Sequence, residues 1–277
     1  MRGLLAFKGC TPNFGAAITD DGAMTGDERA LRFEAVGATD VGIARAGHAN
    51  QDAFEVCRDL WAGGDLLAVV ADGMGGAAAG EVASHRATEA VVRTTAAADP
   101  VATLAEAYQR ANEAVRRIDA VSGPGRPGTT LVAVYFLGTR CWVASVGDSR
   151  VYRLRDGELE LLTHDHSLVQ DEIDAGRLTE AEARVDPRSA LITRTIGGQP
   201  SVEADQTSWP LAAGDRYLAC SDGLWGVLEA GAIAEVLARD GDAPREVADA
   251  LIAASLQAGG PDNVTAVVVE VMADLEG

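Results

Sequence analysis

The sequence predicts an α+β fold, in which antiparallel strands that follow one another along the chain are combined with separate helices. Strand-forming runs at 129–137 and 141–146 are joined by Gly138-Thr139-Arg140, a spacing typical of an antiparallel hairpin. Apolar residues from 104 to 118 recur at the spacing of one helical face. Neither an internal repeat nor a linker between two cores is visible in the 277 residues, so these elements are expected to share one domain.

The first part of the chain contains an irregular start and two expected strands. Residues 1–32 show no sustained periodicity and are expected to form an irregular arm. Arg32–Asp40 alternates like a half-buried strand, and the polar segment Val41–Phe54 follows it. The run Leu67–Ala71 is apolar throughout, without polar alternation, which predicts a buried strand that ends at Asp72.

Two helices are expected next. The first runs from Glu81 to about Ala97, and the second begins at Asp99-Pro100, a favourable N-cap and first-turn pair. The Gly- and Pro-rich segment Ser122–Gly128 is expected to end the second helix. Its buried face is expected to comprise Leu104, Tyr108, Ala111, Val115 and Ile118.

The second half of the chain alternates strands, turns and helices. Gly147–Arg150 is expected to interrupt the strands, and Asp156-Gly157 predicts a tight turn. Residues 176–200 are rich in Arg, Asp, Pro and Gly and are expected to form an exposed excursion. The other expected elements are strands at 151–154, 158–162, 214–220 and 264–271, and helices at 168–175 and 244–258.

Composition and charge exclude several classes of partner. The net charge of −19 argues against nucleic acid or an anionic membrane as a partner, because both require a cationic surface. We find no window of transmembrane length and no signal-peptide apolar region, so a cytoplasmic location is expected. The four cysteines are widely spaced, and Cys141 and Cys220 lie in apolar strand runs, which is typical of reduced core residues.

An aspartate followed by glycine, Asp72-Gly73, ends the most apolar strand. A carboxylate beside a core requires a cation or a set of hydrogen-bond donors, and the carbonyl of Gly73 could serve as a second oxygen ligand. The alternative is an ordinary Asp-Gly turn, which is the commonest role of this dipeptide. The metal interpretation gains weight from Asp222 and Asp262, which also lie at the ends of apolar strands.

Asp52 and Asp148 are further candidates of the same kind. All-oxygen sites suit hard cations such as Mg²⁺ or Mn²⁺, whereas the four histidines show no ligand spacing typical of zinc. Two metals bridged by a carboxylate can bind phosphate oxygens and activate a bound water. Neither a cysteine phosphate-binding loop nor a Gly-x-Ser-x-Gly elbow occurs, so hydrolysis by a metal-bound water fits these residues better than a covalent enzyme intermediate.

A series of short motifs follows in order along the chain. The motifs are Asn50-Gln51-Asp52, Asp72-Gly73-Met74-Gly75-Gly76 with Gly80-Glu81, Gly128-Thr129-Thr130, Val146-Gly147-Asp148-Ser149-Arg150, Leu162-Thr163 with Asp165-His166-Ser167, Ser221-Asp222-Gly223 and Asp262-Asn263-Val264-Thr265. This series resembles a known family, the metal-dependent (type 2C, PPM) serine/threonine protein phosphatases in their bacterial form. The resemblance extends from Glu34 to Val271, and so many motifs in order make a chance match very improbable.

The resemblance implies a four-layer α-β-β-α sandwich, in which two antiparallel sheets pack face to face and helix pairs cover them. It implies a catalytic domain at residues 33–272 after the arm at 1–32. Asp72 resembles the carboxylate that bridges two metals, with Gly73 supplying a backbone carbonyl. Asp222 and Asp262 resemble the remaining ligands of the first metal.

Two further features follow from the same resemblance. Asp52 matches the acid that reaches the second metal through water, and Asp148 resembles the ligand of a third metal, together with Asp222. The cofactors implied are therefore two Mg²⁺ or Mn²⁺ ions, or three if Asp148 binds one. The segment Asp165–Gly198, with Asp186-Pro187-Arg188 inside it, resembles a mobile flap beside the active site, and we call it the flap.

The sequence departs from the family at two positions. The family places a phosphate-binding Arg about five residues before the acid matched by Asp52, where this chain has Gly47. Arg45 lies seven residues before it and is the favoured phosphate anchor, with His48 as the alternative or as a general acid. Some members carry a His after the metal-binding Asp-Gly, where this chain has Met74.

Structural interpretations compete with functional ones at several residues. Asn50 could cap a turn, although the motif set favours a role in metal binding. For Asp148, a structural turn is nearly as good an interpretation as a third metal ligand. Thr129 and Thr130 are expected to stabilise the start of a strand. His166 is expected to order the base of the flap rather than to take part in catalysis.

These observations predict a phosphatase that acts on phosphoserine and phosphothreonine in proteins and opposes a bacterial serine/threonine kinase. Two alternatives stay open: a silent binding module that retains the fold, and hydrolysis of small phosphoesters. A silent module would be expected to lose one of Asp72, Asp222 or Asp262, and all three are present. A monomer is expected, with phosphorylated proteins as its partners.

Overall fold

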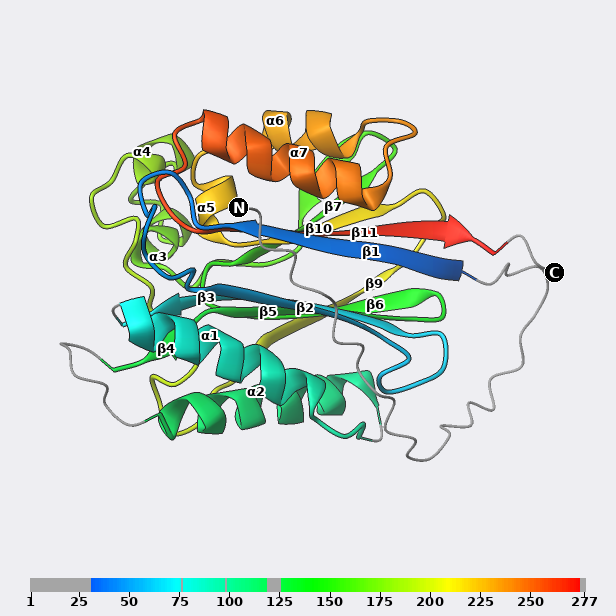
Figure 1. Ribbon diagram of the computed structural model, residues 1–277, viewed down its shortest axis with the longest axis horizontal. Helices are drawn as coiled ribbons and strands as arrows, with labels where there is room; N and C mark the ends of the chain where they lie inside the picture. The colour runs from blue at the N-terminus through cyan, green and yellow to red at the C-terminus, as the bar shows by residue number, and fades with distance from the viewer. Residues whose placement is uncertain (1–30, 76, 98, 119–125, 275–277) are drawn as a thin grey trace.

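The computed structural model describes residues 31–274, apart from residues 76, 98 and 119–125. Two antiparallel sheets lie face to face, and helices cover the outer side of each (Figure 1). The predicted α+β, four-layer α-β-β-α sandwich is therefore confirmed. Within the described residues, every helix is too short or too polar to cross a membrane.

The first sheet has five strands in the order β1-β11-β10-β7-β8. Its first and last strands along the chain lie side by side, because β1 pairs with β11 over its whole length. The strands are β1 (Leu31–Asp40), β7 (Arg150–Arg155), β8 (Glu158–Leu161), β10 (Arg216–Cys220) and β11 (Val264–Ala273).

The second sheet runs in the order β2-β3-β5-β6-β9, with the two-residue strand β4 paired to the end of β3. The predicted hairpin is confirmed, since β5 and β6 pair across the turn at Gly138 and Thr139. The strands are β2 (Asp52–Arg58), β3 (Leu66–Met74), β4 (Gly128–Thr129), β5 (Leu131–Leu137), β6 (Arg140–Val146) and β9 (Asp205–Pro210).

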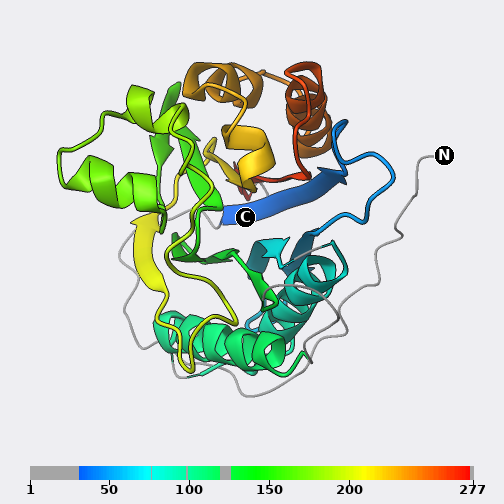
Figure 2. The same ribbon diagram turned by 90° about the vertical axis from the view of Figure 1, so that its left-hand side faces the viewer.

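Helices α1 (Ala77–Val92) and α2 (Pro100–Arg116) cover the second sheet, and α6 (Ala230–Leu237) and α7 (Pro244–Gln257) cover the first (Figure 1). The short helix α5 (Asp222–Trp225) follows β10 directly. Helices α3 (Leu168–Asp174) and α4 (Glu180–Arg184) belong to the flap and project from one end of the sandwich (Figures 1 and 2).

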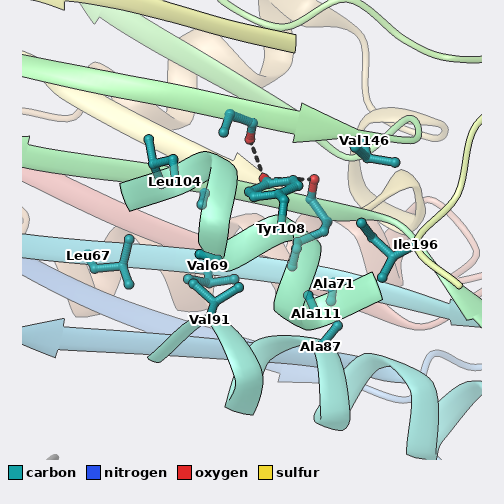
Figure 3. Packing of buried hydrophobic residues seen from close by; sticks show 14 of the residues in the cluster. Leu67, Val69, Ala71, Ala87, Val91, Leu104, Tyr108, Ala111, Val146 and Ile196 are labelled. Carbon is teal, nitrogen blue, oxygen red and sulfur yellow. Dashed lines mark hydrogen bonds between the residues drawn. The ribbon is translucent and has the colours of Figure 1, made fainter. Parts of the chain in front are cut away.

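Three apolar clusters separate the four layers, and β3 contributes to two of them. Leu67 and Val69 face α1 and α2, whereas Leu66 and Val70 face the other sheet, so both sides of the strand are buried. This burial explains why the β3 sequence is apolar without alternation. Tyr108 of α2 lies in the helix-covered cluster, where its hydroxyl donates to the carbonyls of β5 and β6 (Figure 3).

Several boundaries differ from those predicted. The strand β3 continues two residues past Asp72 to Met74, because Gly73 and Met74 pair with β4. Helix α1 begins and ends earlier than the predicted range of 81–97. Asp99 caps α2 as predicted, since its Oδ1 accepts a hydrogen bond of 2.8 Å from the Ala102 amide.

Some elements lack a clear pattern in sequence. Strand β9 contains Pro210 and is half exposed, and α6 was not predicted. Helix α4 lies inside the segment that was expected to form an exposed excursion, and no helix was predicted there. The predicted arm, residues 1–32, lies outside the described residues except for its last two, which begin β1, and most of the segment predicted to end the second helix also lies outside them.

Candidate metal centre

The five aspartates that were predicted to bind metal come from five different parts of the chain. Asp52 begins β2 and lies directly opposite Asp72 of β3 in the strand register. Asp222 begins α5, Asp262 lies two residues before the start of β11, and Asp148 lies in the turn where the chain crosses from β6 to β7. The end of β3 and the start of α5 lie at the same end of the sandwich, which faces the viewer in Figure 2.

Asp52 is buried, and two hydroxyl groups hold one of its carboxylate oxygens. Ser221 Oγ and Thr265 Oγ1 each donate to Asp52 Oδ2 at 2.7 Å. Oδ1 has no hydrogen-bond partner within the described part of the chain. The two hydroxyl groups come from the other sheet, so Asp52 also joins the two sheets at this end.

The backbone of Asp72 is fixed by hydrogen bonds, and its carboxylate interacts with that of Asp222. Its amide donates to Thr130 Oγ1 at 2.9 Å, and its carbonyl accepts from the Thr130 amide and from Thr129 Oγ1. A Cβ on Gly73 would lie 2.0 Å from the carbonyl oxygen of Gly80, so a side chain cannot fit at this position. The two threonines therefore have the structural role predicted from the sequence.

Asp148 and Asp222 each present an oxygen that lacks a protein partner. The Oδ1 atoms of both are buried and have no hydrogen-bond partner among the described residues. The Asp148 backbone is held from the other side, because Trp225 Nε1 donates to its carbonyl at 3.0 Å. The ring of Trp225 stacks on the guanidinium of Arg150, which lies 3.6 Å from the ring centroid.

The carboxylates raise one another's pKa because they are buried together. Burial is the largest cause for each, and it raises the pKa of Asp52 to about 7 and that of Asp148 to about 8. The charge of Asp222 adds to the rise at both residues. The pKa of Asp72 is raised well above its usual range by burial and then by Asp222 and Asp52, and burial also raises the pKa of Asp222.

The residues present fit hard divalent cations in their donor chemistry. Three buried carboxylate oxygens without partners, on Asp52, Asp148 and Asp222, are costly unless a cation or proton satisfies them. All the candidate donors are oxygens, which is the set that Mg²⁺ and Mn²⁺ prefer. Within the described residues, no group of three Asp, Glu, His or Cys side chains lies close enough together to hold an ion. Side chains would therefore have to move to complete the ligand set.

The predicted phosphate anchor, Arg45, lies at the same site. Its Nη2 atom is 2.9 Å from Asp262 Oδ2, and the two side chains are 45% and 39% exposed. His48, the alternative anchor, is exposed on the same loop and donates its backbone amide to the Arg45 carbonyl at 2.9 Å.

Further residues hold Asp52 in place by hydrogen bonds, and only some of them were predicted to belong to the site. The side-chain Nδ2 of Asn50 donates to Thr39 Oγ1, and its Oδ1 accepts from the backbone amide of Asp52. This is the turn-capping role that was the alternative to metal binding. The sequence reasoning assigned no role to Ser221 or Thr265. Both belong to motifs that were noted. Ser221 directly precedes Asp222 and Thr265 lies three residues after Asp262, and this proximity to strand-end aspartates is the signal that could have identified them.

Comparisons with known proteins are specific. A family model described as protein phosphatase 2C matches residues 42–251. The serine/threonine protein phosphatase PstP of Mycobacterium tuberculosis is 41% identical over 252 residues, which cover 87% of this chain and 45% of that protein, so the chain spans about half the length of this relative. The serine/threonine phosphatase stp of Listeria monocytogenes is 36% identical over 212 residues, 74% of this chain and 84% of that protein. A crystal structure of the PstP catalytic domain in complex with two manganese ions has a TM-score of 0.75 at 39% identity and covers 87% of this chain and 99% of that one.

Proposed function

The chain belongs to the protein phosphatase 2C family, and on that premise we propose that it hydrolyses phosphoserine and phosphothreonine in proteins. The observation that carries the proposal is the set of three buried, unpartnered carboxylate oxygens on Asp52, Asp148 and Asp222. A buried cluster of this kind lowers stability unless cations bind to it, which is expected at a functional site rather than at a structural one. The names of the relatives support the choice of substrate class.

Five aspartates and one carbonyl would hold the cations. Asp72 would bridge two ions, and Asp222, Asp262 and the Gly73 carbonyl would complete the first site. Asp52 would serve the second site, and Asp148 with Asp222 a third. The two manganese ions in the PstP catalytic domain support a binuclear site. The all-oxygen donor set would suit Mg²⁺ as well as Mn²⁺. Divalent ions bound there supply Lewis acidity, which neutralises charge on phosphoryl oxygens and lowers the pKa of water.

The protein's own side chains would bind and orient the phosphate. Arg45 carries a guanidinium fork that matches two phosphate oxygens, and it lies at the rim next to Asp262. We propose that Arg45 leaves Asp262 when a cation binds there, and that it then donates to the phosphate. The flap lies at the same end of the sandwich (Figure 2), where it would contact the substrate protein outside the phosphate site.

The physiological substrates would be proteins phosphorylated by a serine/threonine kinase, whose action this phosphatase would reverse. Residues 33–272 would form the catalytic domain, which is the part of the chain that carries all the motifs. The kinase partner follows from the reaction class, since a phosphoprotein phosphatase requires an enzyme that places the phosphate.

Hydrolysis of a phosphothreonine peptide and of an aryl phosphate, each with Mn²⁺ and with chelator, tests the proposal. We expect turnover of both substrates only with the metal. Aryl phosphate turnover without peptide turnover would favour a phosphatase for small phosphoesters. Mn²⁺ binding without any turnover would favour a silent binding module.

A further inference from the structure

His166 lies at the junction between the flap and the turn that carries Asp148. The flap has two roots, the segments near its start and its end by which it joins the sandwich. These roots pair with each other, since Ser167 near the start forms an antiparallel bridge with Ile192 near the end. The His166 amide donates to the Gly147 carbonyl at 2.9 Å, and its carbonyl accepts from the Thr193 amide at 2.8 Å. His166 therefore bonds to the Asp148 turn on one side and to the second root of the flap on the other.

The imidazole adds a third contact to this junction. The Gly147 amide donates to His166 Nδ1 at 3.0 Å, so Nδ1 must carry a lone pair and the ring must be neutral, with its proton on Nε2. Nε2 lies 3.1 Å from Asp205 Oδ2, but the angles at these atoms are unfavourable for a hydrogen bond. The contact with Gly147 is therefore the better defined anchor of the ring.

Both backbone polar groups of Gly147 are thus bonded to one residue, His166. Gly147 has a φ of +100°, and a Cβ there would lie 2.6 Å from Thr130 Cγ2, so the turn is packed closely on its other side. The next residues are also held, because Ser149 Oγ lies 2.7 Å from Thr130 Oγ1 and the Asp148 carbonyl accepts from Trp225. A shift of the His166 ring is the most direct way in which the flap can move Asp148.

We propose that His166 is a positioning residue that couples the conformation of the flap to the placement of the Asp148 carboxylate. When the flap docks on a substrate protein, its two roots would shift and His166 would move with them. The affinity of the Asp148 site for a cation would then change. The inference rests on the proposed function only in assigning a cation to Asp148. The ring acts by accepting a hydrogen bond from the Gly147 amide and takes no part in the reaction itself.

Three single variants isolate this contact. His166→Leu removes the acceptor at similar size, whereas the Oδ1 atom of His166→Asn can still accept from the Gly147 amide. His164→Leu is the matched control, since His164 is exposed and pairs with Asp174 at 2.8 Å. We expect His166→Leu to weaken the weakest Mn²⁺-binding step in calorimetry by about tenfold, as for a buried donor left without its partner. His166→Asn should stay near wild type, and His164→Leu should match wild type.

A mutant cycle with Asp148→Asn distinguishes coupling from a general loss of stability. The effect of His166→Leu on Mn²⁺ binding should disappear in the Asp148→Asn background, because the site it acts on is then absent. Equal effects in both backgrounds, or equal effects of His166→Leu and His164→Leu, would overturn the proposal.

Amide hydrogen exchange supplies a readout that requires neither activity nor a stable leucine variant. Mn²⁺ should slow exchange at the flap-root amides of Leu168 and Thr193 in the wild type, but not in Asp148→Asn. Unchanged exchange at these amides while Asp148-dependent Mn²⁺ binding is observed would contradict the coupling. Failure of the proposed function would instead appear as Mn²⁺ binding and flap protection without hydrolysis, so the two outcomes can be told apart.

Discussion

Arg45 Nη2 lies 2.9 Å from Asp262 Oδ2, so the predicted phosphate anchor is bound to a predicted metal ligand. The two residues are separated by 217 positions in sequence, and the fold brings their loops together at the rim of the site. Ion pairs between partly exposed side chains contribute little stability, so a cation at Asp262 can displace the guanidinium at low cost. The displaced Arg45 would then be free to bind phosphate.

Replacing Arg45 by alanine should raise KM for a phosphothreonine peptide, with a smaller effect on kcat. The reason is that an anchor that binds the ground state and the transition state alike contributes uniform binding. The expected loss in kcat/KM is about 2–3 kcal/mol, the scale of a hydrogen bond to a charged group. Steady-state kinetics against pH measure the effect.

His48→Ala serves as the control for the Arg45 variant, because it lies on the same loop. It should leave KM unchanged, and it should flatten the acid side of the pH profile only if His48 is the general acid. A wild-type KM in Arg45→Ala would assign the anchoring role to another residue.

The flap should affect the selectivity between protein substrates more than the rate of the hydrolytic step. Replacing residues 178–187, which include α4, by a short Gly-Ser linker should change the relative rates on different phosphopeptides and phosphoproteins. Turnover of an aryl phosphate should change less, since that substrate does not extend to the flap. Equal losses on both kinds of substrate would mean that the segment is structural.

Asp148→Asn should have a milder effect than changes at the first two proposed metal sites. It would remove one carboxylate from the proposed third site only, so activity should fall mainly at low metal concentration. The measurement is the rate as a function of Mn²⁺ concentration. A titration curve that coincides with that of the wild type would argue against a third site.

Without metal, the protein should lose stability as the pH rises. A carboxyl whose pKa is raised on folding contributes nothing below its unfolded pKa, and it destabilises the fold progressively up to its folded pKa. For Asp52 and Asp148 the folded pKa values are about 7 and about 8, so the loss should extend from about pH 4 to pH 8. The free energy of unfolding should fall over this range by an amount on the order of a few kcal/mol.

Urea unfolding at pH 5.5 and pH 8.5 in chelator measures this slope, and saturating Mn²⁺ should reverse it. Asp148→Asn should reduce the slope, whereas Asp240→Asn, at an exposed position, should leave it unchanged. Higher stability at pH 8.5 than at pH 5.5 in chelator would contradict the burial of the carboxylate cluster.

The sequence predicted most of the fold where periodicity or turn chemistry was strong. The apolar β3, the β5–β6 hairpin, the capped helix α2 and the strand β11 all formed close to their predicted positions. Strand β9 and the short helix α4 were missed, because neither buries a continuous apolar face.

The aspartates of the site were predictable because each follows or precedes an apolar strand in a recognisable motif. Their supports were less predictable, since they depend on contacts between sheets. Ser221 and Thr265 hold Asp52 from the opposite sheet, and Trp225 supports Asp148 across 77 positions of sequence. The pairing of Arg45 with Asp262 is of the same kind, and local sequence carries no signal for it.

Mn²⁺-dependent hydrolysis of a phosphothreonine peptide by Asp222→Asn and Asp72→Asn tests the central claim most directly. Each substitution removes a negative charge that would offset two divalent cations, so turnover should be abolished at every Mn²⁺ concentration at which the wild type is active. Circular dichroism should confirm that both variants remain folded. An Asp222→Asn protein that retains near-normal Mn²⁺-dependent activity would contradict the binuclear assignment.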